Sequence, residues 1–134
     1  MSSPRVHLLD SNVLVALVVP EHVHHRVARA WFQEGKSFAT CPTVQGTLLK
    51  VLPRQGTRAV DARAALATVI AHPRHEQWLD NITYLDVDLS RVFGHGQVTD
   101  AYMAQLARSR KGRIVTLDGG LAQSAADVAD HLPS

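Results

Sequence analysis

Short apolar runs that each end in a carboxylate recur at three distant places in this 134-residue chain. In an open α/β sheet, acids at the carboxyl ends of parallel strands, or at the starts of the following helices, converge on one crevice. Three such carboxylates repel one another unless a cation lies among them. The pattern therefore predicts a parallel sheet with a divalent-metal site at one edge. The acids are Asp10 after residues 6–9, Asp100 after 98–99 and Asp118 after 114–117.

The stretches between these acids alternate between strand-like and helix-like patterns, which is typical of an α/β fold with a parallel sheet. Thr99 is the predicted N-cap of the helix that carries Asp100, and Pro53 is the predicted end of an earlier helix. Strands are predicted at residues 5–9, 37–40, 82–87 and 113–117. Helices are predicted at residues 13–19, 21–34, 43–52, 57–72, 100–110 and 121–129.

Size and composition predict one domain that spans residues 1–134, since 46% of the residues are hydrophobic. Lysine and arginine exceed the acids by 14 to 12, so the surface is expected to be mildly basic, which by itself does not establish a nucleic-acid partner. Cys41 is the single cysteine, which excludes an intrachain disulfide and favours a cytoplasmic setting. The apolar run 13–19 is far shorter than the roughly 20 residues of a membrane helix, so no membrane association is expected.

Three segments that contain the acids resemble the PIN-domain family of metal-dependent ribonucleases, and in particular the VapC-type toxins of bacterial toxin–antitoxin pairs. They are Leu8–Asn12, Val98–Tyr102 and Val115–Asp118. Residues 39–42, 75–78 and 94–97 are also similar to stretches of the mycobacterial branch of this family. The resemblance covers nearly the whole chain. It implies a PIN-like three-layer α/β/α fold with a central parallel sheet of about four to five strands.

The resemblance implies that Asp10, Asp100 and Asp118 hold one or two Mg²⁺ or Mn²⁺ ions and that the protein is an endoribonuclease acting on looped RNA such as tRNA or rRNA. The residue chemistry agrees, because hard divalent cations take carboxylate oxygens and activate water for attack on phosphorus. Four neighbouring polar residues are expected to orient the carboxylates or waters. They are Ser11, Asn12, Thr99 and Thr116.

Two of the acids also have an ordinary structural interpretation. Asp100 would be favourable near the positive end of a helix dipole, and Asp118 before two glycines would suit a turn. Asp10 is different, because it interrupts an apolar segment and would be costly there without a partner. The combination of all three favours the metal site.

Gln45 departs from the family pattern, in which the stretch Cys-Pro-x-x-Glu supplies a fourth acidic catalytic residue. Here that stretch aligns with residues 41–45 and ends in an amide. An amide oxygen can bind a metal or its water, but it carries no charge and cannot act as a base. Weaker metal binding and slower turnover are therefore expected, whether the glutamine is natural or introduced.

The resemblance also implies partners. A cognate VapB-type antitoxin is expected to lay an apolar helix around Trp31 and Leu48–Leu52 and to place a basic side chain near Asp10. A homodimer is implied as well. Four basic residues are candidates for contacts with RNA phosphates, with plain solvated charge as the alternative. They are Lys50, Arg54, Arg110 and Lys111.

Two other functions stay open at this point. A PIN-like domain that has lost turnover through Gln45 would act as an RNA- or protein-binding module. A phosphotransfer enzyme or receiver domain also uses an aspartate after the first strand, as the phosphoryl acceptor. That chemistry would want a lysine beside the late aspartate, and none follows Asp118.

Overall fold

The computed structural model describes residues 5–133, and within them five strands form one parallel sheet. The spatial order is β3-β2-β1-β4-β5. The chain moves from β1 to one side and later returns to the other, so the strand order reverses between β1 and β4. Ligands of open α/β sheets bind at such a reversal, beyond the carboxyl ends of the strands. The strands are β1 His7–Leu9, β2 Phe38–Thr40, β3 His75–Gln77, β4 Arg113–Thr116 and β5 Ala129–His131.

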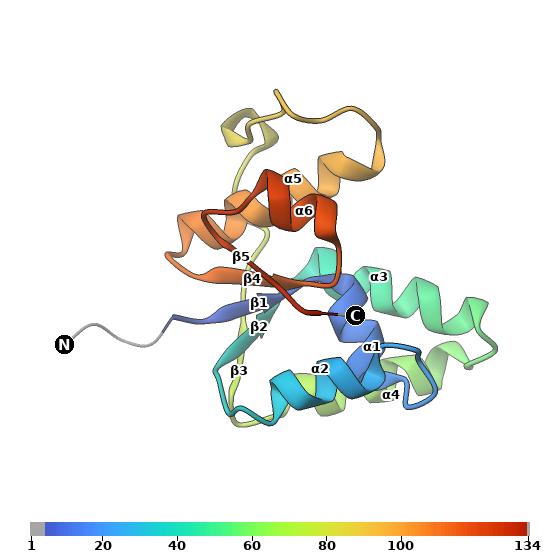
Figure 1. The fold of residues 1–134 in the computed structure, drawn as a ribbon. Coiled ribbons are helices and arrows are strands. Elements are labelled where there is room, and N and C mark those ends of the chain that lie inside the picture. The colour runs from blue at the N-terminus through green and yellow to red at the C-terminus, as the bar shows by residue number, and fades with distance from the viewer. Residues whose placement is uncertain (1–4, 134) are drawn as a thin grey trace.

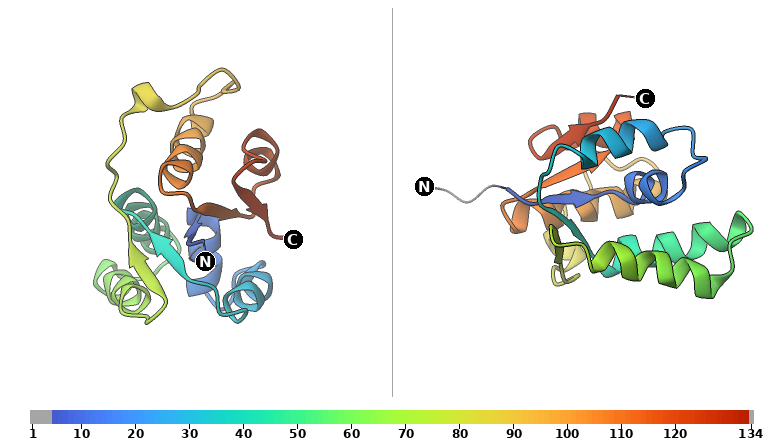
Figure 2. Two further views of the ribbon diagram at one scale, coloured as in Figure 1. Left: turned by 90° about the vertical axis from the view of Figure 1, so that its left-hand side faces the viewer. Right: turned by 90° about the horizontal axis from the view of Figure 1, so that it is seen from below.

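Helices cover both faces of this sheet (Figure 1). The first four lie on one face, and α5 and α6 lie on the other, as the end-on view in Figure 2 shows. This is the three-layer α/β/α arrangement that the sequence predicts, and right-handed crossovers require it for this strand order. The helices are α1 Ser11–Val18, α2 His25–Phe32, α3 Pro42–Arg54, α4 Ala59–Ile70, α5 Gly96–Ser109 and α6 Gly119–Ser124, with a single 3₁₀ turn, η1, at Tyr84–Asp86.

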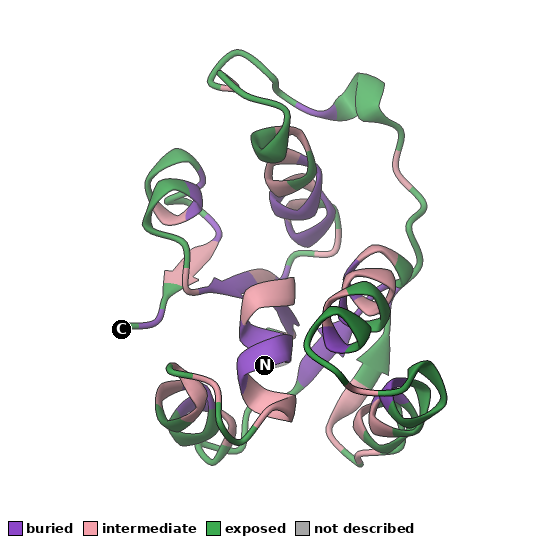
Figure 3. Cartoon of the chain, turned by 90° about the vertical axis from the view of Figure 1, so that its right-hand side faces the viewer, coloured by how far each residue is buried: buried purple, intermediate pink, exposed green. Residues whose placement is uncertain are grey.

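The core lies along the central strands and α1. Every residue of β1 and β2 is buried, and Ile114 and Val115 of β4 are fully enclosed. Strands covered by helices on both faces are expected to be continuously apolar, because neither face meets water. Figure 3 shows the buried residues gathered in these strands and on the inward sides of the helices. The buried core therefore extends as far as the residues that follow β1 and β4.

The predicted strand at residues 82–87 is wrong. This segment is an exposed loop with the turn η1, and Leu85 is 93% exposed. The strand lies earlier, at His75–Gln77, where Phe38 pairs with His75 and Thr40 with Gln77. It forms a sheet edge, where one side of the backbone has no partner and polar residues are tolerated. The apolar alternation at 82–87 therefore has no partner strand to pair with.

Several helix boundaries also differ from prediction, and the helix predicted at 21–34 spans only His25–Phe32. Helix α5 begins at Gly96, so Thr99 lies inside its first turn and His95 takes the N-cap position. Helix α3 includes Pro53 in its last turn, where the missing N–H removes only one hydrogen bond. The last helix ends at Ser124, and residues 129–131 form β5 because they pair with β4.

None of the helices in residues 5–133 combines the length and the apolar character that crossing a bilayer requires.

Candidate active site

Asp10 is the buried acid of the site. It follows β1 and caps α1, where one carboxylate oxygen accepts a hydrogen bond from the backbone N–H of Ser11 at 2.7 Å. The other oxygen accepts one from the hydroxyl of Thr116 at 2.7 Å. Only 6% of Asp10 is exposed. Burial raises the pKa of Asp10, and the hydrogen bonds from Thr116 and Ser11 only partly counter that rise.

Thr116 connects the ends of β1 and β4. Its buried hydroxyl donates to Asp10 and accepts a hydrogen bond from the backbone N–H of Asp118 at 2.9 Å. Asp118 is exposed and caps α6, with Oδ1 accepting from the N–H groups of Gly120 and Leu121. One hydroxyl group therefore sets the relative position of two of the three acids.

Asn12 also connects the ends of β1 and β4, because its side chain accepts a hydrogen bond from the backbone. Its side-chain oxygen accepts a hydrogen bond from the N–H of Leu117 at 3.2 Å, which ties the first turn of α1 to the turn after β4. Thr99, by contrast, is exposed and makes no side-chain hydrogen bond with the described part of the chain. Hydrogen bonds therefore join Ser11 and Thr116 to Asp10, whereas Asn12 bonds to Leu117, next to Asp118, and Thr99 makes no such contact in residues 5–133.

Asp100 enters the site from α5 and is half-buried. Burial, followed by the negative charges of Asp10 and Asp118, raises its pKa to about 6. Asp10 and Asp118 are therefore near enough for their charges to act on Asp100, and the charge of Asp118 also acts on Asp10. The structure thus brings together all three acids that the sequence predicts to converge.

A cleft of about 310 Å³ opens beside these acids. Asp100 and Asp118 line it, and its other walls come from the segment 88–92, α5 and α6. Arg91 and Arg108 line the same cleft. The site therefore places carboxylates and guanidinium groups within reach of one bound molecule.

The three acids have the right chemistry for a divalent metal, but in this structure their carboxylates are not arranged to hold one. Within residues 5–133 no three His, Cys, Asp or Glu side chains lie close enough to hold a metal ion. Asp10 and Asp118 direct carboxylate oxygens to donors of the protein instead. Three carboxylates are nevertheless the oxygen ligands that Mg²⁺ and Mn²⁺ prefer, and a cation would relieve the repulsion that raises the pKa of Asp100. Binding would require the carboxylates to turn toward one another.

Gln45 lies in the first turn of α3, over the ends of the neighbouring strands. Its amide nitrogen donates to the hydroxyl of Thr40 at 2.9 Å and to the side-chain oxygen of Gln77 at 2.7 Å. No hydrogen bond joins it to the three aspartates. The first turn of α3 is held from outside by Asp80, which accepts hydrogen bonds from the N–H and hydroxyl of Thr43. The sequence contains no local signal for this cap, because Asp80 and Thr43 are 37 positions apart.

The four predicted RNA-binding residues do not line the cleft. Lys50 and Arg54 are exposed toward the far end of α3. Arg110 and Lys111 follow α5, and ten residues of helix separate Asp100 from Arg110 by about 15 Å. Arg110 lies over the ring of Trp78 at 5.3 Å.

Comparison with known proteins agrees with this architecture. The family model described as PIN domain matches residues 7–127. Ribonuclease VapC29 of Mycobacterium tuberculosis is 50% identical over 128 residues, which cover 95% of this chain and 96% of that protein.

Two solved structures share the fold. The M. tuberculosis toxin VapC20, whose description is a sarcin–ricin loop cleaving toxin, superposes with a TM-score of 0.68 at 22% identity, over 95% of this chain and 99% of that one. VapBC2 of Rickettsia felis, solved with a promoter DNA fragment, gives 0.68 at 12% identity, over 96% and 99%.

The chain therefore belongs to the PIN-domain family, within the VapC-type ribonuclease toxins of toxin–antitoxin systems. This membership confirms the resemblance drawn from the acidic motifs. It also removes the phosphotransfer and receiver alternatives.

Proposed function

We propose that this protein is a divalent-metal-dependent endoribonuclease that hydrolyses RNA phosphodiester bonds in the cleft beside Asp100 and Asp118. The observation that carries the proposal is the convergence of three acids at the reversal between β1 and β4, where Asp100 has its pKa raised to about 6 by burial and by the other two charges. Kinship with VapC29, which is named a ribonuclease, supports the reaction class.

The three acids would hold Mg²⁺ or Mn²⁺, each from a different position. Asp10 supplies a buried charge whose orientation depends on Thr116 and Ser11. Asp100 and Asp118 line the cleft in which a substrate phosphate would lie. When bound, the metal would supply positive charge that lowers the pKa of the attacking water and stabilises the leaving 3′ oxygen. Without that charge the carboxylates repel phosphate, so they couple substrate binding to metal binding.

The substrate we propose is unpaired RNA, with tRNA or rRNA loops as the class that the family resemblance implies. Proteins recognise RNA sequence mainly in single-stranded loops, because the bases of a stem are hidden in its deep and narrow major groove. The structural relative VapC20 carries the description of a toxin that cleaves such a loop.

We propose a VapB-type antitoxin as the regulating partner and a homodimer as the assembly. Within the antitoxin surface expected around Trp31 and Leu48–Leu52, Trp31, Leu48 and Leu52 are buried in the core, whereas Leu49 is exposed. A largely apolar groove of about 550 Å³ lies instead between α2 and α4. Phe32 and Val69 line it, and an apolar helix of the antitoxin would fit there.

Cleavage of a panel of looped RNAs in Mn²⁺ and in EDTA tests the proposal. We expect cleavage only with metal, and its loss in Asp10→Asn together with most Mn²⁺ binding measured by calorimetry. Asp61→Asn is the matched control, since Asp61 is an exposed acid on α4 and does not line the cleft. Cleavage in EDTA, or full activity of Asp10→Asn, would contradict the proposal.

Gln45 supports a second candidate, a binding module with little turnover. Its amide is held by Thr40 and Gln77 and brings no charge to the acids. RNA binding without cleavage at high Mn²⁺ would favour this function over the nuclease.

A further inference from the structure

The segment at residues 88–93 forms a wall of the cleft and ends in a phenylalanine exposed to water. Phe93 is 90% exposed. Its backbone N–H donates to the side-chain oxygen of Gln97 at 2.6 Å, and Gln97 lines the same cleft as Asp100. In Figure 1 this part of the chain arches over α5. The hydrogen bond to α5 therefore holds the backbone of Phe93 next to the cleft, whose lining includes the preceding residue, Val92.

Arg91 lies two positions before Phe93 and lines the cleft. It forms no ion pair with any residue between 5 and 133, whereas the other arginine of the cleft, Arg108, donates hydrogen bonds of 2.6 and 2.9 Å to Asp127. Two residues span at most about 7 Å of chain, so the guanidinium of Arg91 and the ring of Phe93 can reach one nucleotide.

We propose that Arg91 and Phe93 form a subsite for one unpaired nucleotide beside the scissile phosphate. The inference rests on the proposed cleavage of RNA at Asp100 and Asp118. The guanidinium would bind a backbone phosphate, and the ring would stack on the base. An aromatic ring beside an arginine is the combination with which proteins hold single strands. A base within a stem has no free face, so this subsite selects loops.

The unpaired arginine at the cleft favours RNA over a protein as the occupant, once a divalent cation offsets the four aspartates that also line it, Asp88, Asp100, Asp118 and Asp127. Leu89 on this segment and Leu85 shortly before it are exposed, and alone they would suit an apolar protein surface. Neither lines the cleft, whereas Arg91 does so with no acid of residues 5–133 paired to it. A phosphate needs that positive charge, and an apolar partner does not.

Binding of a short unstructured RNA that contains one 2-aminopurine tests the subsite, because the fluorescence of this base falls when it stacks. Full-length protein is measured in Ca²⁺ and in EDTA. We expect Phe93→Leu to abolish the quenching and weaken binding at least about fivefold, and Phe93→Tyr to retain both. Leu85→Ala, shortly before the segment, should leave binding unchanged.

Arg91→Gln should weaken binding and reduce the salt dependence by about one phosphate contact. Arg63→Gln is the matched control, because Arg63 is exposed on α4 and also forms no ion pair within the described chain. The subsite is wrong if Phe93→Leu quenches and binds as the unmodified protein does, or if Arg91→Gln has no more effect than Arg63→Gln.

Three further outcomes separate the subsite from the alternative functions of this region. If Phe93→Leu and Leu85→Ala alter the sedimentation mass and leave RNA binding intact, the segment is a protein interface and the subsite is wrong. RNA that binds through Phe93 but is never cut in Mn²⁺ would remove the nuclease and keep the subsite. Cleavage at equal rates by the unmodified protein, Phe93→Leu and Arg91→Gln would keep the nuclease and remove the subsite.

Discussion

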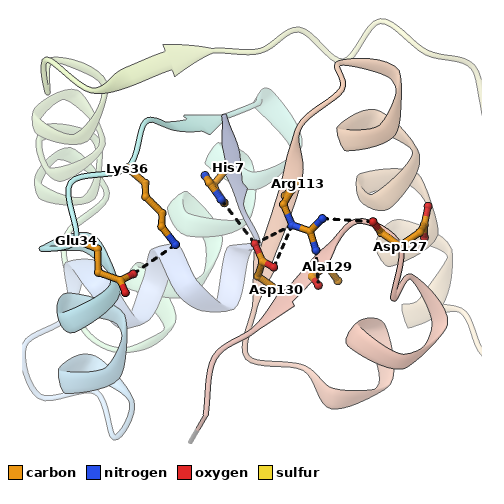
Figure 4. A network of polar contacts seen from close by, with 7 residues as sticks. All are labelled: His7, Glu34, Lys36, Arg113, Asp127, Ala129 and Asp130. Atoms are coloured by element: carbon orange, nitrogen blue, oxygen red, sulfur yellow. Dashed lines mark hydrogen bonds and ion pairs between the residues drawn. The ribbon is translucent and has the colours of Figure 1, made fainter. Parts of the chain in front are cut away.

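The aspartates at the two ends of strand β4 lie in opposite electrostatic environments. At the start of the strand, Nε of Arg113 donates to both oxygens of Asp130 at 3.0 Å, and His7 lies 3.7 Å from the same carboxylate (Figure 4). At the carboxyl end, Thr116 contacts Asp10 and Asp118 with no arginine bonded to either carboxylate in residues 5–133. A positive side chain therefore balances the carboxylate charge at the first end, whereas the carboxylates at the second end have no such partner within the described residues.

The same difference between paired and unpaired acids separates two aspartates that line the cleft, Asp127 and Asp100. A hydrogen bond from Arg108 lowers the pKa of Asp127, whereas burial and neighbouring acids raise that of Asp100 to about 6. Paired acids have already gained their favourable interaction within the protein. Acids without such a partner can still gain a favourable interaction from a ligand, and until one binds they lower the stability of the fold. The uncompensated cluster is therefore where function is expected, in line with the general association of shifted pKa values with active sites.

The strongest test of this contrast is removal of the hydroxyl that links the acids. Thr116→Val keeps the shape of the side chain but leaves one oxygen of Asp10 without its donor, so we expect cleavage to fall about 10–100-fold. The unfolding free energy should fall by about 1–3 kcal/mol. Thr116→Ser restores the donor and should recover most activity. Initial rates and thermal unfolding give both numbers, and an active valine variant would show that Thr116 only fills space.

Adding a negative charge at the uncompensated end should increase the difference between the two ends. We expect Gln45→Glu to raise metal-dependent cleavage about tenfold, or roughly 1.4 kcal/mol in the barrier, because it adds an anionic oxygen to the proposed metal site. The glutamate cannot donate to Thr40 or Gln77, so a small loss of stability is expected as well. Gln45→Ala is the control that removes the amide without adding charge. Equal rates for the glutamate variant and the unmodified protein, at matched Mn²⁺, would place position 45 outside the reaction.

The titration of Asp100 gives a smaller, pH-dependent effect. Its folded pKa of about 6 lies above the ordinary 3.8, so the folded state loses stability as pH rises between these values. Asp100→Asn should therefore match the unmodified protein below about pH 4 and melt a few degrees higher at pH 7.5. Mn²⁺ should close that gap, because only the aspartate gains from a cation. Melting curves at both pH values decide it, and a gap that does not change with pH would mean that neither burial nor the neighbouring acids raise the pKa of Asp100.

The smallest effect is expected at the compensated end. Arg113→Gln should lower the unfolding free energy by about 1 kcal/mol or less, since partly exposed ion pairs contribute little. Cleavage should stay within about twofold of the unmodified protein. A double-mutant cycle with Asp130→Asn isolates the pair. A large loss of activity would show that the two ends of β4 are coupled.

The amino-acid sequence by itself determined the α/β class, the parallel sheet and the meeting of Asp10, Asp100 and Asp118. These follow from local patterns. Apolar runs form buried strands, and parallel strands bring their carboxyl ends to one edge. The resemblance carried by the acidic segments then identified the family without any coordinates.

Only the tertiary structure determined the edge strands of the sheet and the surroundings of the site. The strands at 75–77 and 129–131 are largely polar and form because a neighbouring backbone pairs with them, which no local pattern records. The outside cap of α3 by Asp80, the partners of Gln45 and the place of Arg91 in the cleft likewise depend on residues far apart in sequence. Local chemistry selects the elements, whereas long-range contacts select their partners.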